Sequence, residues 1–313
     1  MKTLLTLALV LNAFIGFSQS DTTMVPFVSY WSLGDSYNFQ VTKVKQRYKE
    51  GNLTKNDSTV YVANWQVVDS TETMYRIKWT YETDLKKYKL PENILNGLSK
   101  YSTTEVVYTT SEVGEFKEIE NWEEISKKMT SLFSELISEG GQGDAALSAE
   151  LEKAFKPMMA MYSSKEGIEQ LVFKELMLFH FPFGLEYPKD EVIEYEDKLP
   201  NMMGGSPIRG NSKLYFEEVD FDDSYCVMVK EMELNPEDTE KMILTVMKKM
   251  GIKKKDLKKV MNSSKFVIND KTVMQYYYYP GVPLRIETTR VSDVDINSLK
   301  QKGVETTILE LVD

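Results

Sequence analysis

The stretch MQYYYYPGVPLRIETT, residues 274–289, has the pattern of a β-hairpin, because a Pro-Gly turn separates two runs rich in β-branched and aromatic residues. Side chains alternate between the two faces of a strand, so Tyr276 and Tyr278 share one face while Tyr277 and Tyr279 share the other. The returning strand has aliphatic residues on one face and charged residues on the opposite face. One tyrosine pair is therefore expected in the core.

The second tyrosine pair shares its face with charges, and two interpretations of it remain open. It receives a ligand or stacks beneath an arginine, or it makes only the cross-strand contacts that are usual on a half-exposed sheet. All four tyrosines are therefore candidate ligand-binding residues. Met158 and Met159 are further candidates, because thioether side chains can line an adaptable apolar surface, although core packing explains them equally well.

The N-terminal half has the same strand signals. Residues 36–119 contain successive runs of alternating β-branched and aromatic residues, separated by short polar turns such as DSTE at residues 69–72. Connections of this length leave no room for crossover helices. We therefore expect an antiparallel meander over residues 36–119.

At Asn121 the apolar period changes to that of a helix. Asn121 can cap this helix, with Glu124 three residues further on, and a second helix is expected to start after Asp144. Pro157 lies inside the second helix and should kink or split it, because proline cannot donate a hydrogen bond to the preceding turn.

Three further helices are expected later in the chain. Ser163 and Glu166 resemble a capping box that opens a helix running to about Phe179. Asn235 has the position of an N-cap, with proline and two acidic residues after it. A lysine-rich segment reaching about Met261 is expected to form a short extra helix. PNMMGGSPIRGN, residues 200–211, is expected to form a flexible loop, and the remaining segments read as strands.

These elements predict an α+β fold, in which one large curved antiparallel sheet of about ten to twelve strands has a central helical segment packed on one side. Residues 19–313 form either one composite domain or two parts, 19–183 and 184–313. The order of elements resembles, loosely, that of the half-barrel carriers of outer-membrane lipoproteins, although no signature of that family is present.

The first 18 residues, MKTLLTLALVLNAFIGFS, have the features of a signal peptide: a positive start, a short apolar stretch and a small-x-small ending. A leader ending in GFSQ resembles those of exported Bacteroidota proteins, many of which are β-rich. The tail TTILELVD does not resemble the C-terminal sorting domain of those that leave the cell. The resemblance therefore implies the periplasm, with secretion as the alternative, and it makes Asp-Ser/Thr sites such as residues 57–59 candidates for O-glycosylation.

Composition excludes several functions. The chain has 38 basic and 48 acidic residues and a net charge of −10, so its surface has no electrostatic basis for binding nucleic acid. Cys226 is the sole cysteine and His180 the sole histidine, which rules out an internal disulfide and a zinc site built from nitrogen and sulfur ligands. Neither residue lies in a nucleophile motif.

Metal and cofactor motifs also fail. Asp293 and Asp295 begin a calcium-loop spacing, but Ser298 replaces its glycine and Val304 replaces its bidentate glutamate. The acidic turn at residues 217–223 could hold a cation, but a solvated turn explains it better. We predict no catalytic residue, no metal and no cofactor.

The function expected from the sequence is therefore a non-enzymatic, periplasmic binding or carrier protein for an apolar or lipid-like ligand. A cavity of several hundred Å³ between helices and sheet would support this expectation. The alternative is an interaction or scaffold protein of the cell envelope, which would bind another envelope protein. A hydrolase that uses scattered carboxylates is a third alternative, and it would need two acids that converge in a cleft.

The leader generates the first prediction. Expressed in its native host, the protein should lose residues 1–18, so intact-mass measurement on the envelope fraction should find a chain that starts at Gln19. A cytosolic protein that keeps Met1 would contradict the predicted export. A mass with no added sugar would contradict the predicted glycosylation.

Overall fold

The computed structural model describes most of the chain after the leader. The expected signal peptide, the expected extra helix near Met261 and part of the expected loop before Ile208 lie outside the described residues. Those residues are 23–84, 92–141, 143–169, 173–199, 206–249, 264–296 and 299–312.

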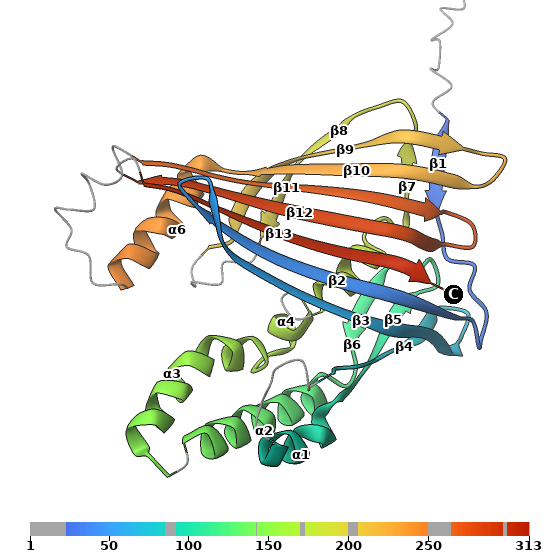
Figure 1. Cartoon of the computed structure of the whole chain (residues 1–313). Helices are drawn as coiled ribbons and strands as arrows, with labels where there is room; N and C mark the ends of the chain where they lie inside the picture. The colour runs from blue at the N-terminus through green and yellow to red at the C-terminus, as the bar shows by residue number, and fades with distance from the viewer. Residues whose placement is uncertain are drawn as a thin grey trace, which may run out of the picture.

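Eleven strands form one antiparallel sheet in the order β6-β5-β4-β3-β2-β13-β12-β11-β10-β9-β8 (Figure 1). The sheet is open, and its edge strands are β6 and β8. Its strands are β2 (Ser36–Lys49), β3 (Asn52–Ser70), β4 (Met74–Glu82), β5 (Thr103–Ser111), β6 (Phe116–Ile119), β8 (Ile193–Leu199), β9 (Ile208–Asp220), β10 (Tyr225–Leu234), β11 (Ser264–Tyr277), β12 (Val282–Ile296) and β13 (Leu299–Val312).

A strand from the C-terminal part of the chain pairs with a strand from the N-terminal part. β13 lies beside β2, with Val312 opposite Asn38 and Gln301 opposite Lys49, so the sheet spans both sides of the boundary near residue 184. A separate two-stranded sheet pairs β1 (Met24–Phe27) with β7 (Leu185–Pro188).

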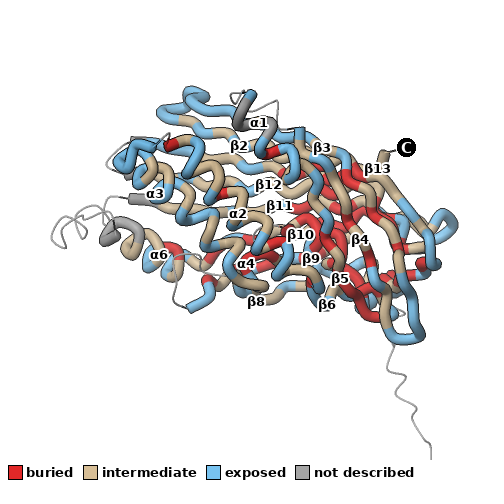
Figure 2. Tube along the Cα trace, turned by 90° about the horizontal axis from the view of Figure 1, so that it is seen from below, coloured by how far each residue is buried: buried red, intermediate tan, exposed pale blue. Residues whose placement is uncertain are grey.

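Helices occupy a small share of the chain and lie on one side of the sheet, which we call its inner face (Figures 1 and 2). They are α1 (Glu92–Leu98), α2 (Trp122–Gly141), α3 (Ala145–Met161), α4 (Lys165–Gly167), α5 (Lys174–His180) and α6 (Pro236–Lys249).

The predicted α+β class is wrong, because the fold is mostly β. Strands contain 54% of the described residues and helices only 27%. The strands are longer than their sequence runs suggested, up to 19 residues in β3, whereas the helical pattern before Phe181 yields the short helices α4 and α5. The helical segment also does not cover the sheet as a layer. α2 and α3 contact each other, and α3 buries no residue.

The meander predicted over residues 36–119 is present, because β2 to β6 pair consecutively. It differs in one connection, where α1 is inserted between β4 and β5. Phe39 and Val41 of β2 are fully buried, as the alternation predicts.

The core is concentrated at one end of the inner face, where Figure 2 shows most of the buried residues near β4, β5, β9 and β10. α5 fills this end. Phe179 stacks on Trp65 at a centroid distance of 5.8 Å and meets the edge of Phe39 at 5.6 Å. Helix and sheet thus share one aromatic core.

Three of the predicted helix starts are confirmed, after Asn121, Asp144 and Asn235, and one is shifted by a residue. The side chain of Asp144 accepts hydrogen bonds from the N–H groups of Ala146 and Leu147, so it is the N-cap of α3. Pro157 lies within α3, which continues past it to Met161. The cap of α4 is Ser164 rather than the predicted Ser163.

Asn121 has a different role from the predicted cap. Its side-chain oxygen accepts from the N–H of Val107 at 2.9 Å, and its amide nitrogen donates to the carbonyl of Glu105 at 3.1 Å. The side chain is therefore used to attach the start of α2 to β5.

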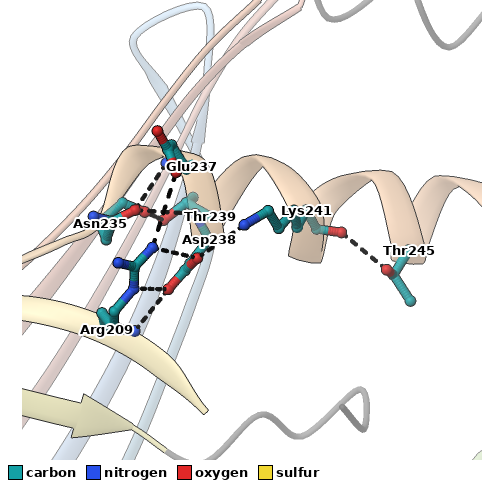
Figure 3. Close-up of polar contacts among 7 residues, drawn as sticks. All are labelled: Arg209, Asn235, Glu237, Asp238, Thr239, Lys241 and Thr245. Carbon is teal, nitrogen blue, oxygen red and sulfur yellow. Dashed lines mark hydrogen bonds and ion pairs between the residues drawn. The ribbon is translucent and has the colours of Figure 1, made fainter. Parts of the chain in front are cut away.

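The start of α6 is attached to β9 (Figure 3). Asn235 Oδ1 accepts from the N–H groups of Glu237 at 3.1 Å and Asp238 at 3.2 Å, which confirms the predicted N-cap. Arg209 of β9 donates to both carboxylate oxygens of Asp238, from Nε at 2.7 Å and from Nη2 at 3.0 Å. This bidentate pair holds the pKa of the Asp238 carboxyl well below its usual range.

The Arg209–Asp238 pair generates the second prediction. Replacing Asp238 with alanine should speed amide hydrogen exchange across the first turns of α6, with little effect on exchange in the sheet, because this ion pair is close to the surface. Glu240→Ala is the matched control, since Glu240 is exposed on the same helix. Equal exchange in both variants would show that the ion pair does not hold α6.

Candidate functional site

The inner face of the sheet changes character along β2. Phe39 and Val41 belong to the buried core, and the next residues on the same face are Lys43, Lys45 and Arg47. Lys45 and Arg47 are exposed. The inner face of β2 is therefore apolar in the first half of the strand and charged in the second half.

The first turn of α5 meets this boundary. Glu175 is 1% exposed, and its two carboxylate oxygens accept from Lys43 Nζ at 3.1 and 3.0 Å. The hydroxyl of Tyr61, on β3, donates to Oε1 of Glu175 at 2.8 Å. A buried carboxylate needs such partners to offset the loss of water, so this contact anchors α5 on the sheet.

Two tyrosines near Glu175 have raised pKa values. Burial, followed by the charge of Glu175, raises the pKa of Tyr61 far above its ordinary value, so Tyr61 stays protonated and keeps donating. The same two causes raise the pKa of Tyr162 to about 12. Tyr162 is the C-cap residue of α3, so the end of α3 lies close enough to Glu175 to feel its charge.

Two more ion pairs lie on the same surface. Arg290 of β12 donates to Asp270 of β11 from Nε at 2.7 Å and from Nη2 at 2.5 Å. Lys45 Nζ lies 3.5 Å from a carboxylate oxygen of Glu305, and Arg290 is the residue opposite Glu305 in the register of β12 and β13. Lys43, Lys45 and Arg290 thus each have a carboxylate partner.

Lys174, at the start of α5, differs from these cations. Its side chain is half-buried, and the described part of the chain supplies its ammonium with no hydrogen bond and no ion pair. Burial is the main cause that lowers the pKa of Lys174. The charge of Glu305 opposes that shift, while the neighbouring cations add to it.

We call the charged residues of the last four paragraphs the inner-face cluster. Three of its four cations have a carboxylate partner, and Lys174 has none among the described residues. A carboxylate or phosphate group is the chemical complement of such a cation. The members of the cluster are Lys43, Lys45, Lys174, Glu175, Asp270, Arg290 and Glu305.

His180 belongs to a buried hydrogen-bond chain and not to this cluster. A carbonyl can only accept, so His180 Nδ1 donates to the carbonyl of Gly114 at 2.8 Å. Nε2 then accepts from the hydroxyl of Tyr108 at 2.9 Å, and that hydroxyl accepts from Trp65 Nε1 at 2.9 Å. Both ring nitrogens have partners, and burial lowers the pKa of His180 to about 3. The geometry assigns His180 a structural role.

Cys226 is equally unsuited to chemistry. It is fully buried in β10, and burial raises the pKa of its thiol to about 12, so it stays protonated. Its strand neighbour is Tyr276, whereas the partners of His180 are Tyr108 and Gly114.

The four consecutive tyrosines alternate as expected of a strand. Tyr276 is fully buried and donates to the carbonyl of Phe179, and Tyr278 is buried beside it. Tyr277 is 39% exposed and Tyr279 is 59% exposed. Ligand binding by any of them stays a prediction.

The methionine candidates lie elsewhere. Met158 is exposed and Met159 half-buried, one turn before the C-cap residue of α3. Figures 1 and 2 place α3 at one end of the molecule and the Tyr277 end of β11 towards the other. The structure therefore does not bring the tyrosine and methionine candidates together.

A hollow of about 740 Å³ lies at the end of the sheet where β2 is followed by β3 and β12 by β13. Strands and the β2–β3 turn line it, so it is not the cavity between helices and sheet that was expected. The lining residues are Tyr48, Gly51, Val267, Asp293, Val294, Asp295, Lys300, Gln301, Lys302 and Val304. Among the described residues, no group of three or more histidine, cysteine or acidic side chains is placed to hold a metal ion.

The inner-face cluster could not be predicted from the sequence. Its one local signal is the alternation of Lys43, Lys45 and Arg47 on the face that begins with Phe39 and Val41. Lys174 and Glu175 lie in a helix far from β2 in the sequence, and no local pattern indicates which strand they meet.

Comparison with known proteins adds little. No family model matches the chain, and no curated protein matches it. Among solved structures, a match is found with Ail, the attachment invasion locus protein of Yersinia pestis, at 5% identity, covering 90% of this chain and 100% of Ail. The TM-score is 0.15, so this match carries no argument about fold or function. In the described part of the chain, no helix combines the length and the apolar character needed to cross a membrane.

The His180 chain generates the third prediction. His180 is neutral in both folded and unfolded states above pH 6.5. As the pH falls from 6.5 towards 3, the unfolded chain takes up a proton that the folded protein refuses, so stability is lost by up to about 1.4 kcal/mol for each pH unit. His180→Gln should be less stable at neutral pH but should lose less stability on acidification.

Urea unfolding midpoints of both proteins between pH 7 and pH 5 measure this difference, because few carboxylates titrate in that range. Parallel pH profiles for the wild type and His180→Gln would show that His180 is not held neutral.

Proposed function

We propose that the mature protein is a non-enzymatic binding or carrier protein of the cell envelope, which takes an amphiphilic ligand with an anionic group on its inner face. The observation that carries this proposal is Lys174, a half-buried cation with no direct partner among the described residues, beside three cations that each have one.

Electrostatics favours an anion at this position. Burial disfavours the charged form of Lys174, and nearby cations increase that cost, so a bound carboxylate or phosphate would relieve both effects. Solvent and ligands can reach the cluster, since the side chain of Lys45 is 64% exposed and that of Glu305 is 47% exposed.

Apolar side chains lie near this position at the end of α3. Met158 is 42% exposed and Met159 is half-buried. The helix ends at Tyr162, close to Glu175. A ligand with its anionic group at Lys174 could therefore lay its apolar part against the end of α3, where the predicted methionines Met158 and Met159 lie.

The location rests on the leader, whose resemblance to Bacteroidota export signals supports the periplasm. The hydrolase alternative gains nothing from the inner-face cluster. Both oxygens of Glu175 are bound by Lys43, and one also accepts from Tyr61, so this buried carboxylate anchors α5 and is not free to act as an acid or base.

The fourth prediction tests the role of Lys174. Dodecyl phosphate should bind the wild-type chain, and Lys174→Met should weaken this binding by about tenfold or more, because the variant keeps a long unbranched side chain and removes its charge. Isothermal titration calorimetry and native mass spectrometry measure the binding.

Two controls make the result specific. Lys198→Met removes an exposed charge from the edge strand β8 and should leave binding unchanged. Dodecyl maltoside, which has no charge, should bind more weakly than dodecyl phosphate and should not distinguish the variants. Equal loss in Lys174→Met and Lys198→Met, or no binding of dodecyl phosphate at all, would overturn the proposed site.

A further inference from the structure

A second surface lies at the end of the sheet where the β9–β10 and β11–β12 hairpins turn (Figure 1). Four exposed aromatic residues and two exposed aspartates define it, and we call it the hairpin-end surface. Its residues are Tyr30, Phe221, Asp222, Asp223, Tyr277 and Tyr279.

The aromatic side chains of this surface are partly exposed to solvent. Tyr30 is 53% exposed, Tyr279 is 59% exposed and Phe221 is 43% exposed. The rings of Tyr30 and Tyr279 lie side by side with centroids 4.9 Å apart. This exposed aromatic area is contributed by segments far apart in the sequence, so it exists only in the folded protein.

Buried anchors hold these rings in place. The N–H of Tyr30 donates to the carbonyl of Pro280 at 3.0 Å, and the adjacent Trp31, which is buried, donates from Nε1 to the carbonyl of Gly281 at 2.9 Å. The N–H of Tyr278 donates to the carbonyl of Ser224 at 2.9 Å, which ties the two hairpin turns together. The surface is therefore preorganised, which lowers the entropy cost of binding.

The acidic turn adds charge to this surface. Asp220 Oδ1 accepts from the N–H groups of Asp222 and Asp223 at 2.9 and 3.1 Å, so Asp220 is used to hold the turn. The carboxylates of Asp222 and Asp223 form no ion pair with the described residues and are exposed.

One cation already lies against this surface. Lys189 Nζ sits 5.4 Å from the centre of the Phe221 ring, within the range of a cation–π contact. A partner segment with several ammonium or guanidinium groups would meet two features along this end of the sheet, namely exposed aromatic rings and carboxylates without an ion pair among the described residues.

We propose that the hairpin-end surface binds a polypeptide segment that carries arginine or lysine side chains. Guanidinium groups stack on tyrosine rings and pair with carboxylates, so they satisfy both features of the surface at once. A purely apolar partner would leave Asp222 and Asp223 unpaired, and an acidic one would be repelled. This inference uses no residue of the inner-face cluster and is independent of the function proposed above.

The fifth prediction uses a synthetic Arg–Gly repeat peptide and the chain without its leader. The peptide should bind, and binding should weaken as salt is added. Tyr30→Leu/Tyr279→Leu keeps apolar area but removes the aromatic faces, and Asp222→Asn/Asp223→Asn removes the charge. Each double variant should weaken binding by about tenfold, measured by calorimetry or peptide fluorescence anisotropy.

Three comparisons decide the outcome. Glu123→Gln/Glu124→Gln changes the net charge equally on an exposed turn of α2 and should leave binding unchanged. If it weakens binding as much as the aspartate variant, attraction is only to the overall negative charge, and the proposal fails. It also fails if the tyrosine variant binds normally, or if a Gly–Ser repeat peptide binds as tightly as the Arg–Gly peptide.

Discussion

The aromatic contact between α5 and the sheet is the constraint on which the rest of the structure depends. Phe179 stacks on Trp65, and Tyr276 donates a hydrogen bond to the carbonyl of Phe179, so α5 is held against both β3 and β11. An open sheet leaves its inner apolar face exposed unless something covers it. At the core end of this sheet, α5 and the β1–β7 pair cover that face, and the position of α5 determines which of its side chains meet the boundary with water.

That position explains the inner-face cluster. With Phe179 in the core, the first turn of α5 reaches the place where β2 changes from apolar to charged residues. Glu175 is fully buried there, with Lys43 and Tyr61 as partners, and Lys174 is left beside cations that already have carboxylates. Two consecutive residues of α5 therefore have opposite roles. Glu175 anchors the helix through its ion pair with Lys43, whereas Lys174 has no ion pair among the described residues.

The groups that look most reactive in the sequence contribute to packing. His180 completes a chain of hydrogen bonds from Trp65 through Tyr108 to Gly114, and Cys226 lies inside a strand. The two surfaces proposed to bind partners use electrostatic and aromatic contacts instead: the inner-face cluster supplies charges, and the hairpin-end surface supplies exposed rings and carboxylates.

The sequence by itself determined the features that depend on neighbouring residues. Strand alternation placed Phe39 and Val41 in the core, and local hydrogen bonding made Asp144 and Asn235 helix caps. The sequence did not determine the balance of strand to helix, because the lengths of β-strands are set by pairing partners such as β13 and β2, which lie at opposite ends of the chain.

Tertiary structure alone decided the two candidate sites. Lys43 and Glu175 are 132 residues apart, and Tyr30 meets Tyr279 only after β1 and β11 are in place. The same is true of Asn121, whose side chain binds β5 instead of capping its helix. Periodicity and capping act within a few residues, whereas ion pairs, burial and ring contacts depend on which distant segments the sheet brings together.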